Sequence, residues 1–268
     1  MKDRVVVITG ASSGIGKACA KYFAQQGCKI VVAARNKEQL QSVADELKAT
    51  YGHCIAVPAD VAVESDCKRL IESTIDAYGK IDVLINNAGI SMRALFNDVT
   101  MEVMHKVMDI NFWGTVYCTK YALPYLLQSK GSVVAVSSIA GKKGLPGRCA
   151  YSASKFAMEG FMETLRTENL KNNLHVLVAC PGYTSSNIRK TALNKDGKAQ
   201  QETPLDESKL MKPEKVAFHI YNAVIKRKRD LVLTTNGKLT VFLNKFFPSR
   251  MDKIVYNFVA KEPESPFK

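Results

Sequence analysis

Two side chains four residues apart, Tyr151 and Lys155, have the types and spacing needed to move a proton. On a helix, residues at this spacing lie on one face, so the phenol and the ammonium group would sit side by side. A free tyrosine titrates at about 10, and a neighbouring cation favours its phenolate form. The spacing therefore predicts a helical acid–base pair in which Lys155 lowers the pKa of Tyr151. Taken alone, it also fits an ordinary exposed helical pair.

A glycine-rich turn near the N-terminus predicts a dinucleotide-binding site. Residues 4–9 are apolar and mostly β-branched, as in a buried strand, and residues 17–24 have a helical pattern. A strand, a glycine turn and a helix N-terminus cradle a pyrophosphate, because glycine lets the backbone come close and the helix end offers unpaired N–H groups. The residues expected to contact the cofactor here are Gly10, Ser12, Ser13, Gly14, Ile15 and Gly16.

The end of the second predicted strand indicates which cofactor is bound. An acidic residue at that point would bond the ribose 2′-hydroxyl of NAD, whereas an arginine suits the 2′-phosphate of NADP. The strand over residues 29–34 is followed by Arg35 and Asn36, with no carboxylate. A guanidinium can grip a phosphate through two hydrogen bonds, so NADP(H) is favoured over NAD(H). If Arg35 is only a solvated surface charge, the preference stays open.

The motifs, taken in order, resemble those of the short-chain dehydrogenase/reductase family over roughly residues 3–235. Residues 136–142 and 150–157 are similar to a narrower group, the 11-beta-hydroxysteroid dehydrogenase-like proteins. The family motifs are Gly10-x-x-x-Gly14-x-Gly16, Asp60-Val61, Asn86-Asn87-Ala88-Gly89, Asn111, Ser138, Tyr151-x-x-x-Lys155 and Pro181-Gly182.

The resemblance implies a role for each catalytic position. Tyr151 would exchange a proton with the substrate oxygen, and Ser138 would hydrogen-bond the same oxygen. Lys155 would bond the nicotinamide ribose and tune Tyr151. Asn111 would hold a backbone kink and a water that connects Lys155 to solvent.

The resemblance also implies the remaining cofactor contacts. Asp60 and Val61 would meet the adenine, and Asn87, Ala88 and Gly89 would line the adenosine side. Pro181, Gly182 and Thr184 would bind the carboxamide. Ser186 stands where the family often has threonine, and it keeps the hydroxyl.

The order of elements predicts an α/β fold, namely a Rossmann-type doubly wound parallel sheet in three α/β/α layers and a single domain. Strand-like runs alternate with helical patterns, as such sheets require. The runs fall near residues 4–9, 29–33, 54–57, 82–85, 132–137, 174–179 and 231–235. We assign residues 1–235 to the catalytic domain, with a mobile substrate lid at about 184–212, and residues 236–268 to a C-terminal extension. By resemblance, helices around 100–128 and 151–172 would pair subunits into a homodimer or homotetramer.

The C-terminal extension is basic and amphipathic. The chain has a formal net charge of +13, and residues 226–261 hold a large share of the excess. Apolar residues recur at helical spacing from Leu239 to Phe247 and again from Met251 to Val259, which predicts two short helices. They could cover the sheet, the substrate cleft or a subunit interface, or they could lie on an anionic membrane and admit a lipophilic substrate. Nucleic acid is not expected as a partner, because no recognition motif accompanies the basic run 226–229.

Metal chemistry and export are not expected. The four histidines and seven cysteines lack the spacing of a zinc site, and unpatterned cysteines suggest reduced thiols in the cytoplasm. The N-terminus leads directly into the first strand without an apolar signal segment, and no run of 18 apolar residues predicts a spanning helix.

Three functions remain open at this stage. The first is an NADP(H)-dependent oxidoreductase that transfers hydride between nicotinamide and a small-molecule carbonyl or secondary alcohol. The second is an epimerase or lyase of the sugar-nucleotide branch, which shares the Tyr-x-x-x-Lys motif and is disfavoured by the shorter chain. The third is a catalytically silent NADP(H)-binding regulator, disfavoured by the complete set of Asn111, Ser138, Tyr151 and Lys155.

Overall fold

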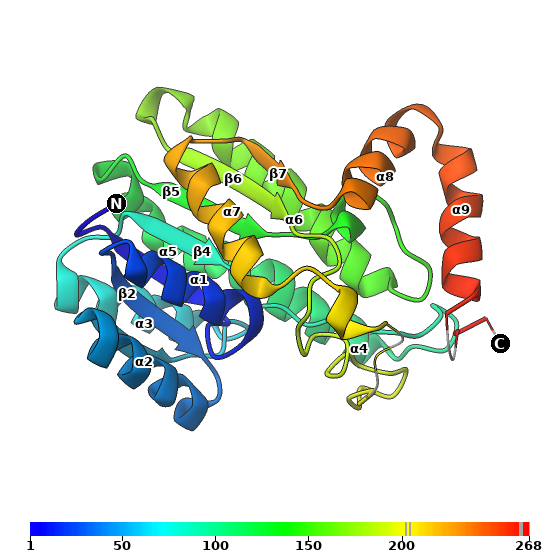
Figure 1. Ribbon diagram of the computed structural model, residues 1–268, viewed down its shortest axis with the longest axis horizontal. Coiled ribbons are helices and arrows are strands. Elements are labelled where there is room, and N and C mark those ends of the chain that lie inside the picture. Colours follow the sequence, from blue (N-terminus) through cyan, green and yellow to red (C-terminus); the bar gives the residue numbers. More distant parts are fainter. Residues whose placement is uncertain (202, 204, 263–264, 268) are drawn as a thin grey trace.

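Seven parallel strands form one sheet in the computed structural model, which describes residues 1–201, 203, 205–262 and 265–267 (Figure 1). Their order across the sheet is β3-β2-β1-β4-β5-β6-β7. The strands are β1 (Val5–Thr9), β2 (Lys29–Ala34), β3 (Cys54–Pro58), β4 (Val83–Asn86), β5 (Ser132–Val136), β6 (His175–Cys180) and β7 (Asp230–Val232). The predicted fold class is thus confirmed. Strand β7 ends earlier than the sequence predicted, because Thr234 already caps the next helix.

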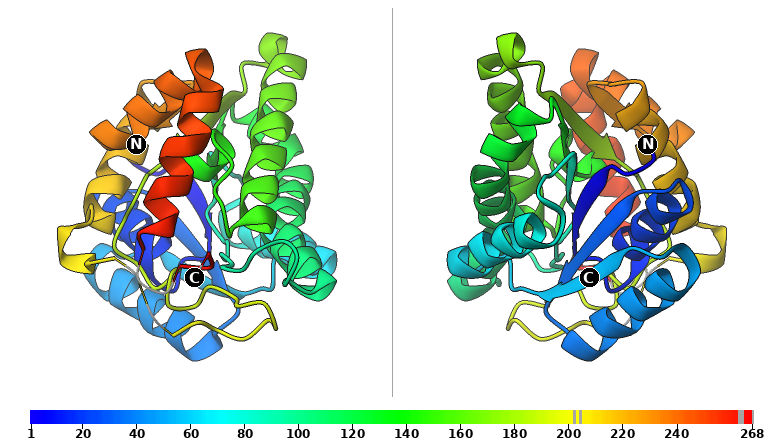
Figure 2. Two further views of the ribbon diagram at one scale, coloured as in Figure 1. Left: turned by 90° about the vertical axis from the view of Figure 1, so that its right-hand side faces the viewer. Right: turned by 90° about the vertical axis from the view of Figure 1, so that its left-hand side faces the viewer.

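Helices cover both faces of the sheet, as the two side views show (Figure 2). One face carries α1 (Gly14–Gln25), α2 (Lys37–Tyr51) and α7 (Pro213–Ile225). The other carries α3 (Glu64–Tyr78), α5 (Gly114–Gln128) and α6 (Cys149–Glu168), with α4 (Met101–Met108) packed against α6. Because each central strand is buried on both faces, its residues are apolar without alternation.

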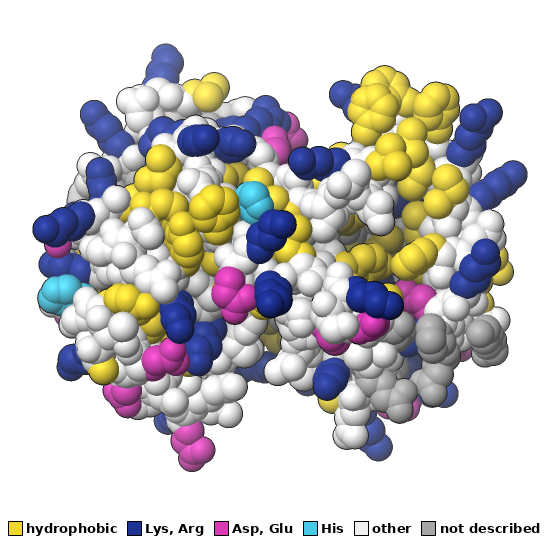
Figure 3. All heavy atoms as spheres, in the orientation of Figure 1, with side chains coloured by type: hydrophobic (Ala, Val, Ile, Leu, Met, Phe, Trp, Pro, Cys, Tyr) yellow, Lys and Arg dark blue, Asp and Glu magenta, His cyan; other side chains and the backbone are white. Residues whose placement is uncertain are grey.

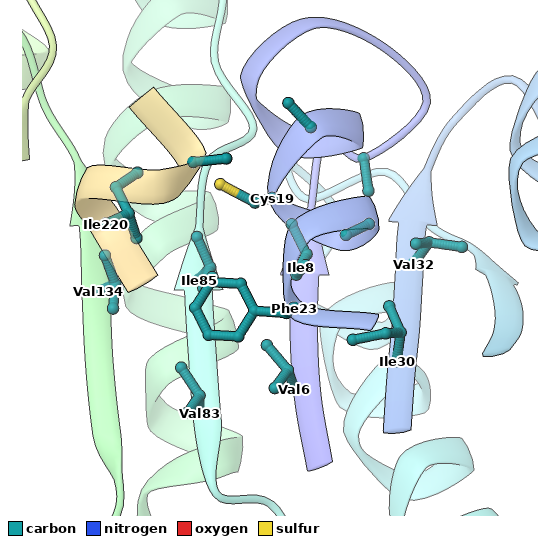
Figure 4. Packing of buried hydrophobic residues seen from close by; sticks show 14 of the residues in the cluster. Val6, Ile8, Cys19, Phe23, Ile30, Val32, Val83, Ile85, Val134 and Ile220 are labelled. Atoms are coloured by element: carbon teal, nitrogen blue, oxygen red, sulfur yellow. The ribbon is translucent and has the colours of Figure 1, made fainter. Parts of the chain in front are cut away.

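The core on the α1 face shows how the sheet is held. Val6 is level with Ile30 of β2 on one side and with Val83 of β4 on the other. Phe23 of α1 lies over these strands and is fully buried (Figure 4). Replacing so large a buried ring by alanine typically costs 3–5 kcal/mol, so this layer fixes the position of α1.

The strand order reverses direction between β1 and β4. The chain goes from β1 outward to β2 and β3, and then returns to start β4 on the other side of β1. At such a switch point the connecting loops diverge and leave a crevice at the carboxyl ends of the strands. Gly10, Arg35, Asn87, Ser138 and Pro181 all follow the strand ends at this edge.

The last two helices, α8 (Thr235–Phe246) and α9 (Pro248–Ala260), confirm the helices predicted from the spacing of apolar residues. They form a hairpin beside the carboxyl edge of the sheet (Figure 1). None of the helices in the described part of the chain has the length and hydrophobicity needed to span a bilayer. Residues 202 and 204 of the predicted lid, and 263, 264 and 268 of the predicted extension, lie outside the described residues.

Candidate active site

The glycine turn after β1 is held against the end of β4 by side-chain hydrogen bonds. The Asn87 amide donates to the carbonyls of Thr9 (2.9 Å) and Gly10 (3.1 Å). The Thr9 hydroxyl accepts from the backbone N–H groups of Asn87 and Ala88, each at 3.1 Å. Thr9 was not among the predicted site residues, although a hydroxyl residue between an apolar strand and a glycine turn is a usable signal.

Two glycines in the turn cannot carry a side chain. Gly10 has a φ of +63°, and a Cβ there would lie 2.8 Å from the Ala88 Cα. A Cβ on Gly16 would lie 2.3 Å from the Gly10 carbonyl oxygen. The start of α1 can therefore pack close to the end of β4 only because neither position has a side chain.

The N-terminus of α1 is open towards the crevice. Ser13 is the N-cap residue, yet its side chain makes no capping hydrogen bond, and the first turn of the helix holds no acidic residue. Ser12 is partly buried and Ser13 is exposed. The first N–H groups of the helix therefore keep their capacity for an anion.

The end of β2 presents a guanidinium to solvent. The Arg35 side chain is 57% exposed, and its Nη1 lies 4.0 Å from the Asp60 carboxylate. The Asp60 Oδ1 accepts from the N–H of Ala62 at 3.1 Å, which fixes that carboxylate at the end of β3. Arg35 and Asp60 thus flank the same side of the crevice.

Two of the residues assigned to the adenosine side also have structural partners. The Asn36 side chain caps α2 by accepting from the Gln39 N–H at 2.9 Å. Val61 is buried, and a Cβ on Gly114 would lie 2.7 Å from its Cγ2. Helix capping accounts for Asn36 and side-chain packing for Val61, and their contacts with a cofactor remain predictions.

Ser138, Tyr151 and Lys155 meet at one point. Ser138 follows β5 and caps the short 3₁₀ helix η2 (Ile139–Gly141), where its hydroxyl accepts from the Ala140 N–H at 3.2 Å, and it lines the same cavity as Tyr151. Tyr151 and Lys155 lie one turn apart on α6, with the Lys155 Nζ 5.7 Å from the centre of the Tyr151 ring. Lys155 is only 3% exposed and donates to the Val136 carbonyl at 2.9 Å. The helical pair predicted from the sequence is therefore a buried one.

Asn111 lies in a π-helical segment, η1 (Asp109–Trp113), between α4 and α5. Its side chain accepts from the Ile90 N–H (2.8 Å) and donates to the Ile90 carbonyl (2.9 Å) and to the Ser154 hydroxyl (2.9 Å). A Cβ on Gly89 would lie 3.1 Å from Asn111 Oδ1 and 3.6 Å from Lys155 Nζ. The helical irregularity thus brings Asn111 and Lys155 to the same glycine, and π segments of this kind are frequent at functional sites.

The pKa of Tyr151 differs from the sequence expectation. Burial in the cleft raises the pKa of the phenol, and the hydrogen bond with Ser138 lowers it by less. Burial also lowers the pKa of Lys155 to about 8, while Cys180 and Glu159 act in the opposite direction. Lys155 was expected to lower the pKa of Tyr151. The pKa is raised instead, because burial disfavours the charged forms of both side chains.

Glu159, one turn beyond Lys155 on α6, was not among the predicted site residues. Its carboxylate accepts from the hydroxyl of Ser137 (3.0 Å) and the thiol of Cys180 (3.4 Å), and it forms an ion pair with Lys142. An acidic residue four positions after a motif lysine would have pointed to it, because that spacing keeps it on the same helical face.

The segment after β6 is organised by an ion pair. Arg189 donates to the Glu207 carboxylate through two nitrogens (2.8 and 2.7 Å) and to the Thr184 carbonyl (2.7 Å). Gly182 has a φ of +74°, and Thr184 is buried. Ser186 is held through its N–H, which donates to Glu207 at 3.3 Å. The predicted motion of this lid remains a prediction.

A cavity of about 350 Å³ opens in front of Tyr151. The glycine-turn side contributes Ile15, Asn87 and Gly89, and the segment after β6 contributes residues 181–184. Its outer wall is α9, through Met251, Ile254, Val255, Phe258 and Val259. The C-terminal helices thus cover the cleft, one of the roles that the sequence left open.

The end of α9 is anchored beside the cavity. Glu262 is buried, and its carboxylate lies 3.1 Å from Arg93 and 3.9 Å from Arg148. An ion pair of Lys143 with Asp252 adds a contact near the start of α9. These pairs join residues far apart in the chain, and no local pattern predicted them.

The sheet, the glycine turn and the switch-point crevice define a dinucleotide-binding α/β protein. The family model of the short chain dehydrogenases matches residues 4–197, and the chain belongs to that family.

Relatives of this chain span most of its length. It is 36% identical to mouse dehydrogenase/reductase SDR family member 7B over 271 residues, 99% of this chain and 84% of the relative. It is 36% identical over 275 residues, 99% of this chain and 76% of the relative, to an uncharacterized oxidoreductase of Bacillus subtilis. An Arabidopsis 11-beta-hydroxysteroid dehydrogenase-like protein is 42% identical over 69% of this chain and 60% of its own length. The chain is therefore an oxidoreductase of this family.

Two solved structures share the fold. A Burkholderia phymatum short chain dehydrogenase/reductase in complex with NAD has a TM-score of 0.82 at 24% identity, covering 93% of this chain and 95% of its own. A Thermococcus sibiricus alcohol dehydrogenase complexed with 5-hydroxy-NADP has a TM-score of 0.77 at 22% identity, covering 87% and 96%.

Proposed function

We propose that the protein is an NADP(H)-dependent oxidoreductase that interconverts a carbonyl compound and the corresponding alcohol, with Tyr151 as its acid–base residue. The observation that carries this proposal is the meeting of Ser138, Tyr151 and Lys155 at a cavity that residues of the glycine-turn side also line. The three polar groups converge on one small volume. Arg148, Arg189 and Glu262 also line the cavity, and most of its wall surface is apolar. This arrangement suits a lipophilic substrate with one reactive oxygen.

The residues at the crevice fit a nicotinamide dinucleotide. A Cβ on Gly10 or Gly16 would clash with the turn and with the residues after β4. Because both glycines lack a Cβ, the backbone of the turn can lie close to a pyrophosphate. The uncapped start of α1 would receive its charge, and Arg35 would receive a 2′-phosphate. The bound nicotinamide would supply or accept a hydride, which is chemistry that the protein side chains lack.

The catalytic residues would handle the proton and the charge on the substrate oxygen. In reduction, the Tyr151 hydroxyl would donate its proton to that oxygen while the Ser138 hydroxyl hydrogen-bonds it. The raised pKa of Tyr151 keeps the phenol protonated and ready to donate. Lys155 would place a positive charge near the phenolate that forms, and Asn111 would hold a path for its proton near Gly89.

Arg35→Ala should remove most of the preference for NADPH over NADH. A hydrogen bond to a charged group contributes about 1.5–3 kcal/mol, so the ratio of kcat/KM values for the two cofactors should fall roughly 10–100-fold. The measurement is steady-state kinetics with each cofactor. Lys37→Ala, an exposed neighbour, serves as the control. An unchanged ratio in Arg35→Ala would remove the NADP assignment.

The pH dependence of the turnover rate should follow the titration of the Lys155 ammonium group. Its charged form is needed, and its pKa is about 8, so the rate should fall as pH rises through about 8. The negative charge of Glu159 raises this pKa, so Glu159→Gln should move the fall to lower pH. Glu163→Gln on the exposed side of the same helix is the control. Superimposable pH profiles of the Glu159 variant and the wild type would exclude this link.

We also propose that subunits pair through the outer surfaces of α5 and α6. Trp113, the last residue of η1 just before α5, and Phe156 of α6 have side chains that are 44% and 47% exposed. Burying such side chains in a symmetric contact would stabilise a dimer.

A further inference from the structure

The α8–α9 hairpin exposes an apolar patch beside the cavity. Phe242 and Phe246, one turn apart on α8, are 59% and 57% exposed, and their rings lie 5.1 Å apart. The remaining members, all about half exposed, are Leu239, Phe247, Ile254 and Phe258. Figure 3 shows apolar side chains gathered over α8 and continuing towards the hollow beside α9. A contiguous exposed apolar patch marks a binding surface.

The patch is continuous with the cavity. Ile254 and Phe258 belong to both, because they line the cavity and are still about half exposed. Phe258 also stacks on Tyr183, another lining residue, with ring centres 6.2 Å apart. An apolar molecule resting on the patch would therefore reach the cavity over the side chains of Ile254 and Phe258.

Basic side chains surround the patch. Five basic residues on the hairpin and just after it are exposed. None of the five forms an ion pair with an acidic residue in the described part of the chain. They are Lys238, Lys245, Arg250, Lys253 and Lys261. Lys245 and Arg250 lie over the rings of Phe246 and Phe247, at 6.0 and 5.6 Å from the ring centres. This arrangement, with apolar stems and rings below and charges at the edge, is typical of side chains at a lipid–water boundary.

The charge argues against a second copy of this chain as the occupant. The acidic residue of the hairpin, Asp252, is paired with Lys143. A symmetric contact would place the basic rim of one copy against that of the other. An anionic bilayer would instead attract each basic residue and accept the aromatic rings.

We propose that the α8–α9 hairpin docks on the surface of an anionic lipid bilayer, and that lipophilic substrate enters the cavity from the bilayer along Phe258. The first part is independent of the reaction, and the second rests on the proposed function.

The test is flotation of the full chain with vesicles of phosphatidylcholine alone and of phosphatidylcholine with phosphatidylserine. Wild type should float with the anionic vesicles, and less so at high salt. Binding should fall at least about tenfold in Phe242→Ser/Phe246→Ser, because two large apolar side chains are removed, and also in Lys245→Glu/Lys253→Glu. Phe96→Ser and Lys48→Glu/Lys171→Glu change exposed residues elsewhere and should bind as wild type does.

Several outcomes would overturn docking on an anionic bilayer. They are wild type that fails to float, equal flotation with both vesicle types, and flotation of Phe242→Ser/Phe246→Ser that equals wild type. A change from dimer to monomer in that variant without wild-type flotation would identify a second copy as the occupant. Phe242 and Phe246 lie outside the cavity wall, so NADPH turnover of a water-soluble carbonyl should persist in the variant. Failure of flotation with normal turnover would thus leave the proposed function standing.

Discussion

Replacing Tyr151 by phenylalanine is expected to lower turnover by about 10²–10⁴-fold, the range that a positioned proton donor contributes. NADPH binding should change by less than about threefold, because only one hydroxyl is lost and the ring still packs in the cleft. The ring keeps its place one turn before Lys155, with the Lys155 Nζ 5.7 Å from its centre. Stopped-flow hydride transfer and NADPH fluorescence titration measure the two quantities separately.

The control for this variant is Tyr117→Phe, which removes the same hydroxyl from α5, outside the cavity wall. It should retain activity. If Tyr151→Phe kept most of its turnover, or if it lost NADPH binding to the same degree as turnover, Tyr151 would not be the acid–base residue.

Gly16→Ala is expected to abolish useful NADPH binding. Its Cβ would lie 2.3 Å from the Gly10 carbonyl oxygen and 2.5 Å from the Asn87 Nδ2, so the turn and the side chain that holds it must both shift. Overpacking of this kind costs about 1–3 kcal/mol of stability. Because we propose that the displaced turn holds the cofactor phosphates, NADPH affinity should fall at least about 100-fold, equivalent to roughly 3 kcal/mol. Thermal unfolding and fluorescence titration provide the two readings.

Gly160→Ala is the matched control. Gly160 lies within α6, and a Cβ there would meet nothing within 4 Å. Alanine should therefore be neutral or should stabilise the protein by about 0.4–1 kcal/mol. Tight NADPH binding by Gly16→Ala would show that the turn does not hold the phosphates.

The sheet could be predicted closely from the sequence. Short apolar runs such as residues 132–137 have few alternatives to a buried strand, and six further runs matched strands to within a few residues. Strand β7 was extended too far because Leu233 is apolar, whereas Thr234 has a positive φ and caps α8. The polarity of neighbouring residues does not show where a strand ends and where the N-cap residue of the next helix begins.

The candidate site was predictable where local motifs specify it, and not where distant segments meet. Tyr151 and Lys155 share a helix, so their spacing placed them together. The pKa of Tyr151 is raised because other elements bury its side chain, and the spacing of two residues on one helix carries no information about that burial. Likewise, the amphipathic pattern of α9 predicted a helix, but its place over the cavity depends on Glu262 binding Arg93 and Arg148.

We propose that this protein transfers hydride from NADPH to a carbonyl carbon while Tyr151 supplies the proton. The most direct test incubates the purified protein with 4-deuterated NADPH and a panel of ketones and aldehydes, including keto-steroids, long-chain 3-keto lipids, quinones and small aromatic carbonyls. The products are analysed by mass spectrometry, with Tyr151→Phe run in parallel. We expect deuterium on the former carbonyl carbon of a lipophilic product for the wild type and almost none for the variant. Equal deuterium transfer by both proteins, or tight NADPH binding without transfer to any member of the panel, would show that this protein does not carry out hydride transfer assisted by Tyr151.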